Sequence, residues 1–310
     1  MSGGRPIRPR RALLFVPGTH ADRFEKAVAS GVDSVCIDLE DSVTEGKKNQ
    51  ARQNAVDYIL SVAAAGTGAG GPELIVRINT PKSDAGLEDL EALERNGARP
   101  DAIILPKVGG PEAVRSVAER LDASFEEGTP VLLPLIETAA GLHRVEEIAT
   151  ASTGETALVA ALLFGGFDLA AELGSSTEWE ALLYARSRIV HSAALAGLPS
   201  MDMPDRDVRD TEGLARNASA ARGLGFSGKM AIHPAQVPVI QDAFSPTDLE
   251  VERARRVVVA AEAGEADGQG VVLLDGHMVD LPVVRAARST LAAHEAATSR
   301  TVGPQTGADS

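Results

Sequence analysis

The stretches VLLPLIET (131–138) and ALVAALLFGGFD (157–168) are two neighbouring apolar runs, and each has a carboxylate at or next to its last position. Both runs are apolar enough to be buried strands, so their acids, Glu137 and Asp168, stand where a strand ends. A buried strand with a carboxylate at its carboxyl end places a ligand or a catalyst there. Two such acids suit a hard divalent cation, with Mg²⁺ as the first choice. The alternative is that both acids cap the helices that follow.

Six further apolar runs extend this pattern along the chain, separated by amphipathic or alanine-rich segments such as 111–121 and 178–197. Near-continuous apolar strands that alternate with helices indicate a parallel sheet covered on both faces. Eight strands in about 235 residues predict a closed (β/α)8 TIM barrel. A doubly wound open sheet is the alternative, but it would more often have fewer strands and a glycine-rich first turn. The six runs are ALLFVPG (12–18), SVCIDLED (34–41), ELIVRIN (73–79), AIILPK (102–107), PSMDMP (199–204) and GKMAIHP (228–234).

Nearly every predicted strand ends in a polar or special residue. Because the active site of such a barrel is built at the carboxyl ends of its strands, we expect the chemistry to gather at that edge. These strand ends carry Glu40 and Asp41, Arg77 and Asn79, Lys107, Glu137, Asp202 and His233.

The composition argues against several classes of function. A net charge of −14 is unsuited to a nucleic-acid surface, which needs a basic stripe. No apolar run approaches the roughly 20 residues of a membrane-spanning helix. The single cysteine, Cys36, has no partner for an intrachain disulfide, as in a reducing compartment. The basic start is followed by an apolar run too short for an export signal, so we expect a cytoplasmic protein.

The chain after residue 245 departs from the barrel repeat. SPTDLEVERARR predicts a capped helix start, and a glycine-rich segment, a strand-like VVLLDGHMVD and another helix follow it. The predicted organisation is a disordered tail (1–9), a barrel (10–245), a C-terminal helical module (246–297) and a disordered tail (298–310).

Taken together, these motifs resemble those of the citrate lyase β-subunit-like family of the HpcH/HpaI aldolase superfamily, which includes malyl-CoA and citramalyl-CoA lyases. The resemblance implies a Mg²⁺-dependent carbon–carbon lyase, with Mn²⁺ as an alternative ion. It would cleave a 3-hydroxy-3-carboxyacyl-CoA thioester, of the citramalyl-CoA or malyl-CoA type, to acetyl-CoA and a small 2-oxo acid by retro-Claisen chemistry. The motifs span residues 10–297: RALLFVPGTHADRFEKA, DLEDSV followed by KKNQAR, VRIN, LPKV, LIETAAG, FGGFDLAAELG, GKMAIHPAQV and DGHMVDLP.

The resemblance also assigns roles around the metal. The family's metal ligands map onto Glu137 and Asp168, and Glu137 would also contact the bound acid. Arg77, from VRIN, matches an active-site arginine that can hold the thioester oxygen as it becomes an enolate. The alternative is a structural pairing of Arg77 with Glu40 or Asp41. These two acids are expected to orient metal-bound water and Arg77, or else to cap the next helix.

Asp280, in DGHMVDLP, matches the family aspartate that exchanges a proton with the methyl carbon of acetyl-CoA. In the family this C-terminal segment acts as a lid over a neighbouring subunit's barrel. The resemblance therefore implies a homo-oligomer, a trimer or a hexamer, with lids shared between subunits. The alternative for Asp280 is an N-cap of the helix that begins at Pro282.

Contacts with coenzyme A are implied by the same resemblance. Lys48 has the spacing to meet a phosphate, although as part of an amphipathic helix it could equally be exposed surface. Glyoxylate and pyruvate differ by one methyl group, which allows an enzyme to discriminate between them by only about 1–3 kcal/mol. Met201, Met203 and Phe167 are candidates for the pocket wall that would contact this methyl group. The residues implied in substrate and coenzyme binding are Phe15, His20, Lys26, Lys48, Arg77, Glu137 and Phe167.

Three alternative functions use the same skeleton. The enolate-forming groups would also serve a malyl-CoA thioesterase or a synthase. The chain could instead be a citrate lyase β-subunit that acts on a citryl thioester of an acyl carrier protein within a complex. A metal aldolase that acts on free 2-oxo acids without coenzyme A is the third, and the DGHMVDLP motif argues against it because a lid would be superfluous there.

Overall fold

The computed structural model describes residues 9–65, 71–125, 128–151, 159–266, 268 and 270–298. The chain divides into two compact units, Arg10–Phe244 and a C-terminal unit from Ser245 onward. Apart from Pro9 and Thr298, the predicted tails (1–9 and 298–310) lie outside the described residues.

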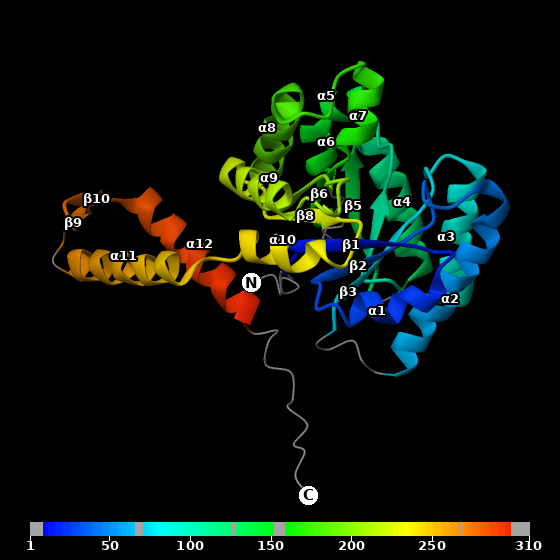
Figure 1. Cartoon of the computed structure of the whole chain (residues 1–310), viewed down its shortest axis with the longest axis horizontal. Coiled ribbons are helices and arrows are strands. Elements are labelled where there is room, and N and C mark those ends of the chain that lie inside the picture. The colour runs from blue at the N-terminus through cyan, green and yellow to red at the C-terminus, as the bar shows by residue number, and fades with distance from the viewer. Residues whose placement is uncertain are drawn as a thin grey trace, which may run out of the picture. The chain divides into compact units, whose positions relative to one another are not determined.

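The first unit is a closed barrel of eight parallel strands in sequential order, which confirms the (β/α)8 prediction (Figure 1). Strand β8 closes the barrel on β1, from Ala12↔Lys229 to Leu14↔Ala231. The strands are β1 (Ala12–Pro17), β2 (Ser34–Asp38), β3 (Glu73–Arg77), β4 (Ala102–Leu105), β5 (Val131–Ile136), β6 (Leu162–Phe164), β7 (Ser200–Asp202) and β8 (Gly228–Ala231).

Helices follow the strands and surround them (Figure 1). Their ends carry the expected signals: Ser83 accepts a hydrogen bond from the backbone of Gly86 at 3.1 Å at the start of α3, and Gly97 ends that helix with a φ of 62°. The helices of this unit are η1 (Ala21–Arg23), α1 (Phe24–Val28), η2 (Glu45–Lys47), α2 (Lys48–Ala64), α3 (Asp84–Asn96), α4 (Pro111–Ser124), α5 (Ala139–His143), α6 (Val145–Ala149), α7 (Gly166–Leu173), α8 (Trp179–Ala196), α9 (Thr211–Leu224) and α10 (Gln236–Phe244).

Alternating side chains give the barrel two apolar layers. Leu14 and Val76 belong to the large cluster that also holds helix residues, whereas Leu13 and Ile75 belong to a separate cluster of strand residues. Successive side chains of a strand point to opposite faces, so one layer packs against the helices and the other fills the barrel. Truncating a fully buried residue such as Ile75 to alanine is expected to cost about 2–5 kcal/mol.

The strands end earlier than predicted. Strand β5 stops at Ile136 rather than at residue 138, and β6 covers only Leu162–Phe164 of the predicted 157–166, part of which lies outside the described residues. Glu137 and Lys107 thus follow their strands, whereas Arg77 and Asp202 are the last residues of β3 and β7. Leaving the hydrogen-bonded sheet frees the backbone to turn, and this lets side chains of different strands converge.

The C-terminal unit contains α11 (Asp248–Ala266), β9 (Val272–Leu274), β10 (His277–Val279) and α12 (Leu281–Thr298). The predicted helix start is confirmed, because Thr247 and Glu250 hydrogen-bond to each other's backbone N–H groups. Strands β9 and β10 pair antiparallel around Asp275 and Gly276, both at positive φ, as a tight hairpin requires. No helix in the described part of the chain has the length and apolar character of a bilayer span.

Candidate active site

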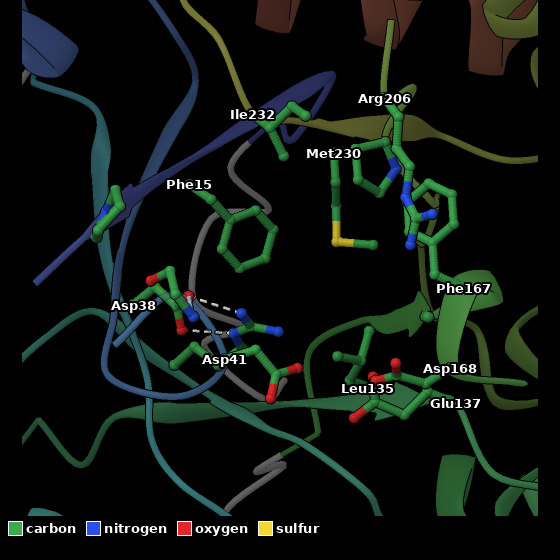
Figure 2. Close-up of a pocket in the computed structure, with 15 residues that line it drawn as sticks. Phe15, Asp38, Asp41, Leu135, Glu137, Phe167, Asp168, Arg206, Met230 and Ile232 are labelled. Carbon is green, nitrogen blue, oxygen red and sulfur yellow. Dashed lines mark hydrogen bonds and ion pairs between the residues drawn. The ribbon is translucent and has the colours of Figure 1, made fainter. Parts of the chain in front are cut away.

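The alternation that fills the barrel also builds a cavity at the carboxyl ends of its strands. Side chains two positions apart on a strand point the same way, so the residues that follow the interior layer lie above it. The cavity has a volume of about 420 Å³ (Figure 2). Its wall includes Phe15, Asp38, Arg77, Glu137 and Ile232, each two positions after a residue of the interior cluster.

Arg77 is held by two buried acids. Its Nε and Nη2 donate to the two carboxylate oxygens of Asp38, both at 2.6 Å, and its Nη1 lies 3.0 Å from Oε2 of Glu40. Burial alone would lower the pKa of Arg77, but these acids raise it above its ordinary value. Burial acts in turn to raise the pKa of Asp38, and the Arg77 charge outweighs it and holds that pKa below its usual range. The guanidinium is therefore a fixed cation, stacked 5.0 Å from the Phe15 ring centroid.

The predicted pairing of Arg77 with Glu40 is present, whereas a pairing with Asp41 is not. The bidentate partner is Asp38, which the sequence analysis did not single out. Glu40 is a second neighbour, and Asp41 is exposed and contacts Lys107 instead. A signal was present: Asp38 stands two positions after interior Cys36 and two before Glu40, on the same face of its strand.

Lys107, in the turn after β4, contacts acids that follow β2 and β5. Its φ of 53° is unusual for a residue with a side chain. Its backbone N–H donates to Oε1 of Glu137 at 2.8 Å, while its ammonium lies 2.5 Å from Glu40 and 3.4 Å from Asp41. Burial raises the pKa of Glu40 in spite of the opposing charges of Arg77 and Lys107. This turn positions Glu40 and Glu137 at once.

Glu137 is a buried acid whose pKa lies far above its ordinary value. It is only 3 % exposed, and burial, together with the charges of Glu40 and Asp168, raises its pKa to about 9. Asp168 stands in the first turn of α7 and lines the cavity at the same end as Glu137 (Figure 2). A divalent cation between the two carboxylates would relieve this excess of negative charge.

The donor set fits Mg²⁺ with water completing its coordination. Among the described residues no group of three or more histidine, cysteine or acidic side chains is placed to hold a metal ion. Mg²⁺ commonly binds one or two protein carboxylates and keeps several waters, and a substrate can replace some of them. Glu137 and Asp168 are therefore sufficient protein ligands for this ion.

Two glycines at the start of α7 allow close packing, one of them against Glu137, a predicted metal ligand. A Cβ at Gly165 would lie 2.4 Å from Cβ of Glu137, and one at Gly166 would lie 2.3 Å from Sδ of Met203. The first helical hydrogen bond of this turn is from the backbone of Leu169 to the carbonyl of Gly165, at 3.2 Å. The preceding N–H groups of α7 thus have no acceptor within the helix, and they favour an anion beside Asp168.

The residues predicted to meet coenzyme A are spread over the unit. Phe15 and Phe167 line the cavity. His20 and Lys26 are exposed residues before η1 and on α1, and they do not line it. Lys48 has all three of its donors occupied, by the carbonyls of Leu39 and Glu40 and by Oδ1 of Asn79, at 2.6–2.8 Å. Neither predicted role of Lys48, phosphate contact or exposed surface, describes this arrangement, so we leave it out of the proposed coenzyme site.

Asp280 lies in the C-terminal unit, before α12. Its Oδ1 accepts from the backbone of Val283 at 3.2 Å, which is an N-cap interaction. A cap does not exclude a second role, and the catalytic assignment of Asp280 stays a prediction. Of the two methionines considered for the pocket wall, Met201 lies in the barrel interior and Met203 lines a neighbouring cavity, whereas Phe167 lines both cavities.

Comparison with known proteins places this geometry in a family. Residues 11–234 match the family model of the HpcH/HpaI aldolase/citrate lyase. The chain is 33 % identical to the mitochondrial citramalyl-CoA lyase of Homo sapiens, over 91 % of this chain and 85 % of that protein. It is 36 % identical to the citrate lyase subunit beta of Escherichia coli K12, over 94 % and 95 % of the two chains.

A solved structure shows that the similarity includes the three-dimensional fold. It is the CitE protein of Mycobacterium tuberculosis in complex with magnesium, acetoacetate and coenzyme A, at 30 % identity and a TM-score of 0.76. The match covers 94 % of this chain and all of that one. The family match and the two relatives each span most of the barrel described above. The chain therefore belongs to the HpcH/HpaI aldolase/citrate lyase family.

Proposed function

We propose that this chain is a Mg²⁺-dependent carbon–carbon lyase that cleaves a 3-hydroxy-3-carboxyacyl-CoA thioester to acetyl-CoA and a 2-oxo acid. Citramalyl-CoA, malyl-CoA and citryl-CoA all belong to this substrate class. The observation that carries the proposal is one cavity lined by buried Glu137, Asp168 and the fixed guanidinium of Arg77. The lyase names of the relatives and the ligands of the mycobacterial structure support it.

Glu137 and Asp168 would hold the Mg²⁺ ion. When bound, the ion would neutralise the two acids and polarise the oxygen on C3 of the substrate. The N–H groups at the start of α7 would orient the substrate carboxylate beside Asp168. The raised pKa of Glu137 means that a proton competes with the metal for this carboxylate.

Arg77 would stabilise the enolate. Cleavage of the C2–C3 bond leaves an electron pair on C2 that is delocalised onto the thioester oxygen. The C3 hydroxyl gives its proton to solvent water, and C3 becomes the carbonyl of the 2-oxo acid. A guanidinium held at both Nε and Nη2 by Asp38 can keep its other N–H groups directed at that oxygen. Because it is already oriented, little reorganisation accompanies the reaction.

The remaining step is protonation of C2, which turns the enolate into the methyl group of acetyl-CoA. We assign this proton to Asp280, the aspartate of the C-terminal unit that matches the family motif. In this proposal the unit acts as a lid on a neighbouring subunit, in a trimer or a hexamer. Phe15 would contact the coenzyme beside Arg77.

The test is release of acetyl-CoA from (S)-citramalyl-CoA, (S)-malyl-CoA and citryl-CoA, with Mg²⁺ and with EDTA. We expect cleavage that EDTA abolishes, and that Asp168→Asn abolishes while its circular dichroism stays unchanged. Release of free coenzyme A without acetyl-CoA would identify a thioesterase instead. Cleavage that survives both EDTA and the substitution would refute the metal site.

A further inference from the structure

A second cavity of about 240 Å³ adjoins the first, and the two share Phe167, Pro204 and Arg206. Arg206 lies in the loop between β7 and α9. Its guanidinium carbon is 3.9 Å from the centroid of the Phe167 ring, a close stacking contact. Figure 2 shows Arg206 and Phe167 at the end of the cavity that holds Asp168 and Glu137. A cation therefore lines the same cavity as the predicted metal ligands.

The acids next to Arg206 in the sequence are engaged elsewhere. Asp205 accepts from Asn217 Nδ2 at 2.6 Å through Oδ1, and its Oδ2 lies 3.0 Å from the ammonium of Lys229. Oδ1 of Asp207 accepts from a backbone N–H in the same loop. Within the part of the chain that the structure describes, no carboxylate lies within ion-pair distance of Arg206, and its guanidinium stacks on the Phe167 ring.

The other cations around the two cavities are neutralised by the protein. Arg77 is paired with Asp38, and Lys229 is buried between Asp202 and Asp205, at 2.9 and 3.0 Å. Arg186 donates to Asp202 at 2.9 Å. Of the cationic side chains that line these cavities in the described residues, Arg206 is thus the one whose charge no acid of the chain balances.

The chemistry of the substrate class identifies what an unbalanced cation could bind there. One carboxylate of the 2-oxo acid belongs beside the metal ligands. The acids of this class then differ in the substituent on the oxo carbon, which is hydrogen, a methyl group, or an arm that ends in a second carboxylate. Hydrogen and methyl need no cation. A guanidinium matches a carboxylate in charge and in its paired donor geometry.

We propose that Arg206 is a specificity-determining residue that binds a second carboxylate of the substrate. The preferred thioester would then be one whose 2-oxo acid product is a diacid, as citryl-CoA yields, rather than the citramalyl or malyl type. This inference rests on the proposed function and names the substrate within its class. It follows from the position of Arg206 on the side of Glu137 and Asp168, where the oxo acid would lie.

The test compares kcat/KM for citryl-CoA and citramalyl-CoA in the wild type, Arg206→Met and Arg206→Lys. Loss of a charged hydrogen bond should lower kcat/KM for citryl-CoA by about tenfold or more in Arg206→Met and leave citramalyl-CoA unchanged. Arg206→Lys should keep part of the citryl-CoA activity. Arg216→Met is the matched control, because Arg216 is an exposed residue of α9 that lines neither cavity, and it should alter neither substrate.

An equal loss with both thioesters would overturn the assignment, because Arg206 would then serve a shared part of the substrate, such as a coenzyme phosphate. An unchanged kcat/KM for citryl-CoA would overturn it as well. If the wild type cleaves none of citryl-CoA, citramalyl-CoA and malyl-CoA, the proposed function fails. The binding of the free 2-oxo acids then tests the role of Arg206 by itself. Mg²⁺-dependent binding of fresh oxaloacetate more tightly than pyruvate, lost in Arg206→Met, would uphold the assignment. Equal binding of the two acids would overturn it.

Discussion

Replacing Glu137 by glutamine tests the electrostatics of the site without any substrate. In the metal-free chain, burial and the charges of Glu40 and Asp168 raise the pKa of Glu137 from 4.5 to about 9. The folded state therefore holds this proton over a pH range in which the unfolded state has already released it. Because the folded state binds more protons than the unfolded state in this range, the free energy of unfolding of the wild type falls as pH rises from about 4.5 to about 9.

The magnitude follows from the width of that window. Each pH unit inside it lowers the free energy of unfolding by at most about 1.4 kcal/mol, so the three units from about pH 5 to about pH 8 amount to at most about 4 kcal/mol. Glutamine does not titrate, and its carbonyl oxygen can still accept the hydrogen bond from the backbone of Lys107. Glu137→Gln should therefore be more stable than the wild type, by a margin that widens with pH.

Urea unfolding in EDTA at several pH values between about 5 and 8 measures this margin. The same substitution at Glu119, an exposed residue of α4, is the matched control and should give a margin that does not change with pH. Saturating Mg²⁺, at about 100 times the wild-type Kd, should add about 2.7 kcal/mol to the wild type and to Glu119→Gln, but not to Glu137→Gln. A margin for Glu137→Gln that stays flat across this range would refute the burial argument.

Two further substitutions test the geometry of the site. Gly165→Ala should lower Mg²⁺ affinity, measured by titration, because its Cβ would lie 2.4 Å from that of Glu137. Gly223→Ala is the control, because a Cβ at Gly223 would have no neighbouring atom within 4 Å, and it should leave Mg²⁺ affinity unchanged. Equal Mg²⁺ affinities of the two variants would contradict the packing argument. Asp280→Asn should leave coenzyme A binding intact and cut turnover by about 100-fold or more, as loss of a general acid does. Mixing it with Arg77→Ala protein should restore activity if lids are shared between subunits, and an inactive mixture would refute sharing.

The fold could be predicted because its signal is repeated along the whole chain. Runs such as ELIVRIN and VLLPLIET are apolar on both faces, which only a strand covered on both sides requires. The limits of the strands could not be predicted as well. The run 157–166 is apolar throughout, whereas β6 covers only Leu162–Phe164, because pairing with neighbouring strands and not hydrophobicity decides where a strand stops.

The candidate site was predicted in part. Glu137, Asp168 and Arg77 line one cavity as expected, because the carboxyl ends of the barrel strands meet at one edge. The partners of the lysines could not be predicted. Lys48 turns inward to Asn79 and two carbonyls, and Lys107 links Glu40 to Glu137 from a turn with positive φ. These partners are distant in the sequence and come together only when the ends of several strands converge in the folded barrel.

The charged residues of the site form two groups, and the difference between them indicates where ligands would bind. Asp38, Glu40, Arg77 and Lys107 neutralise one another within a network that needs no ligand. Glu137 and Asp168, by contrast, repel each other, so this end of the cavity favours a cation. A bound divalent cation would neutralise those two acids and remove the repulsion that an anionic substrate would otherwise meet there. Because Arg206 adds a positive charge at the same end, the metal and a doubly charged acid would complete one balanced site together.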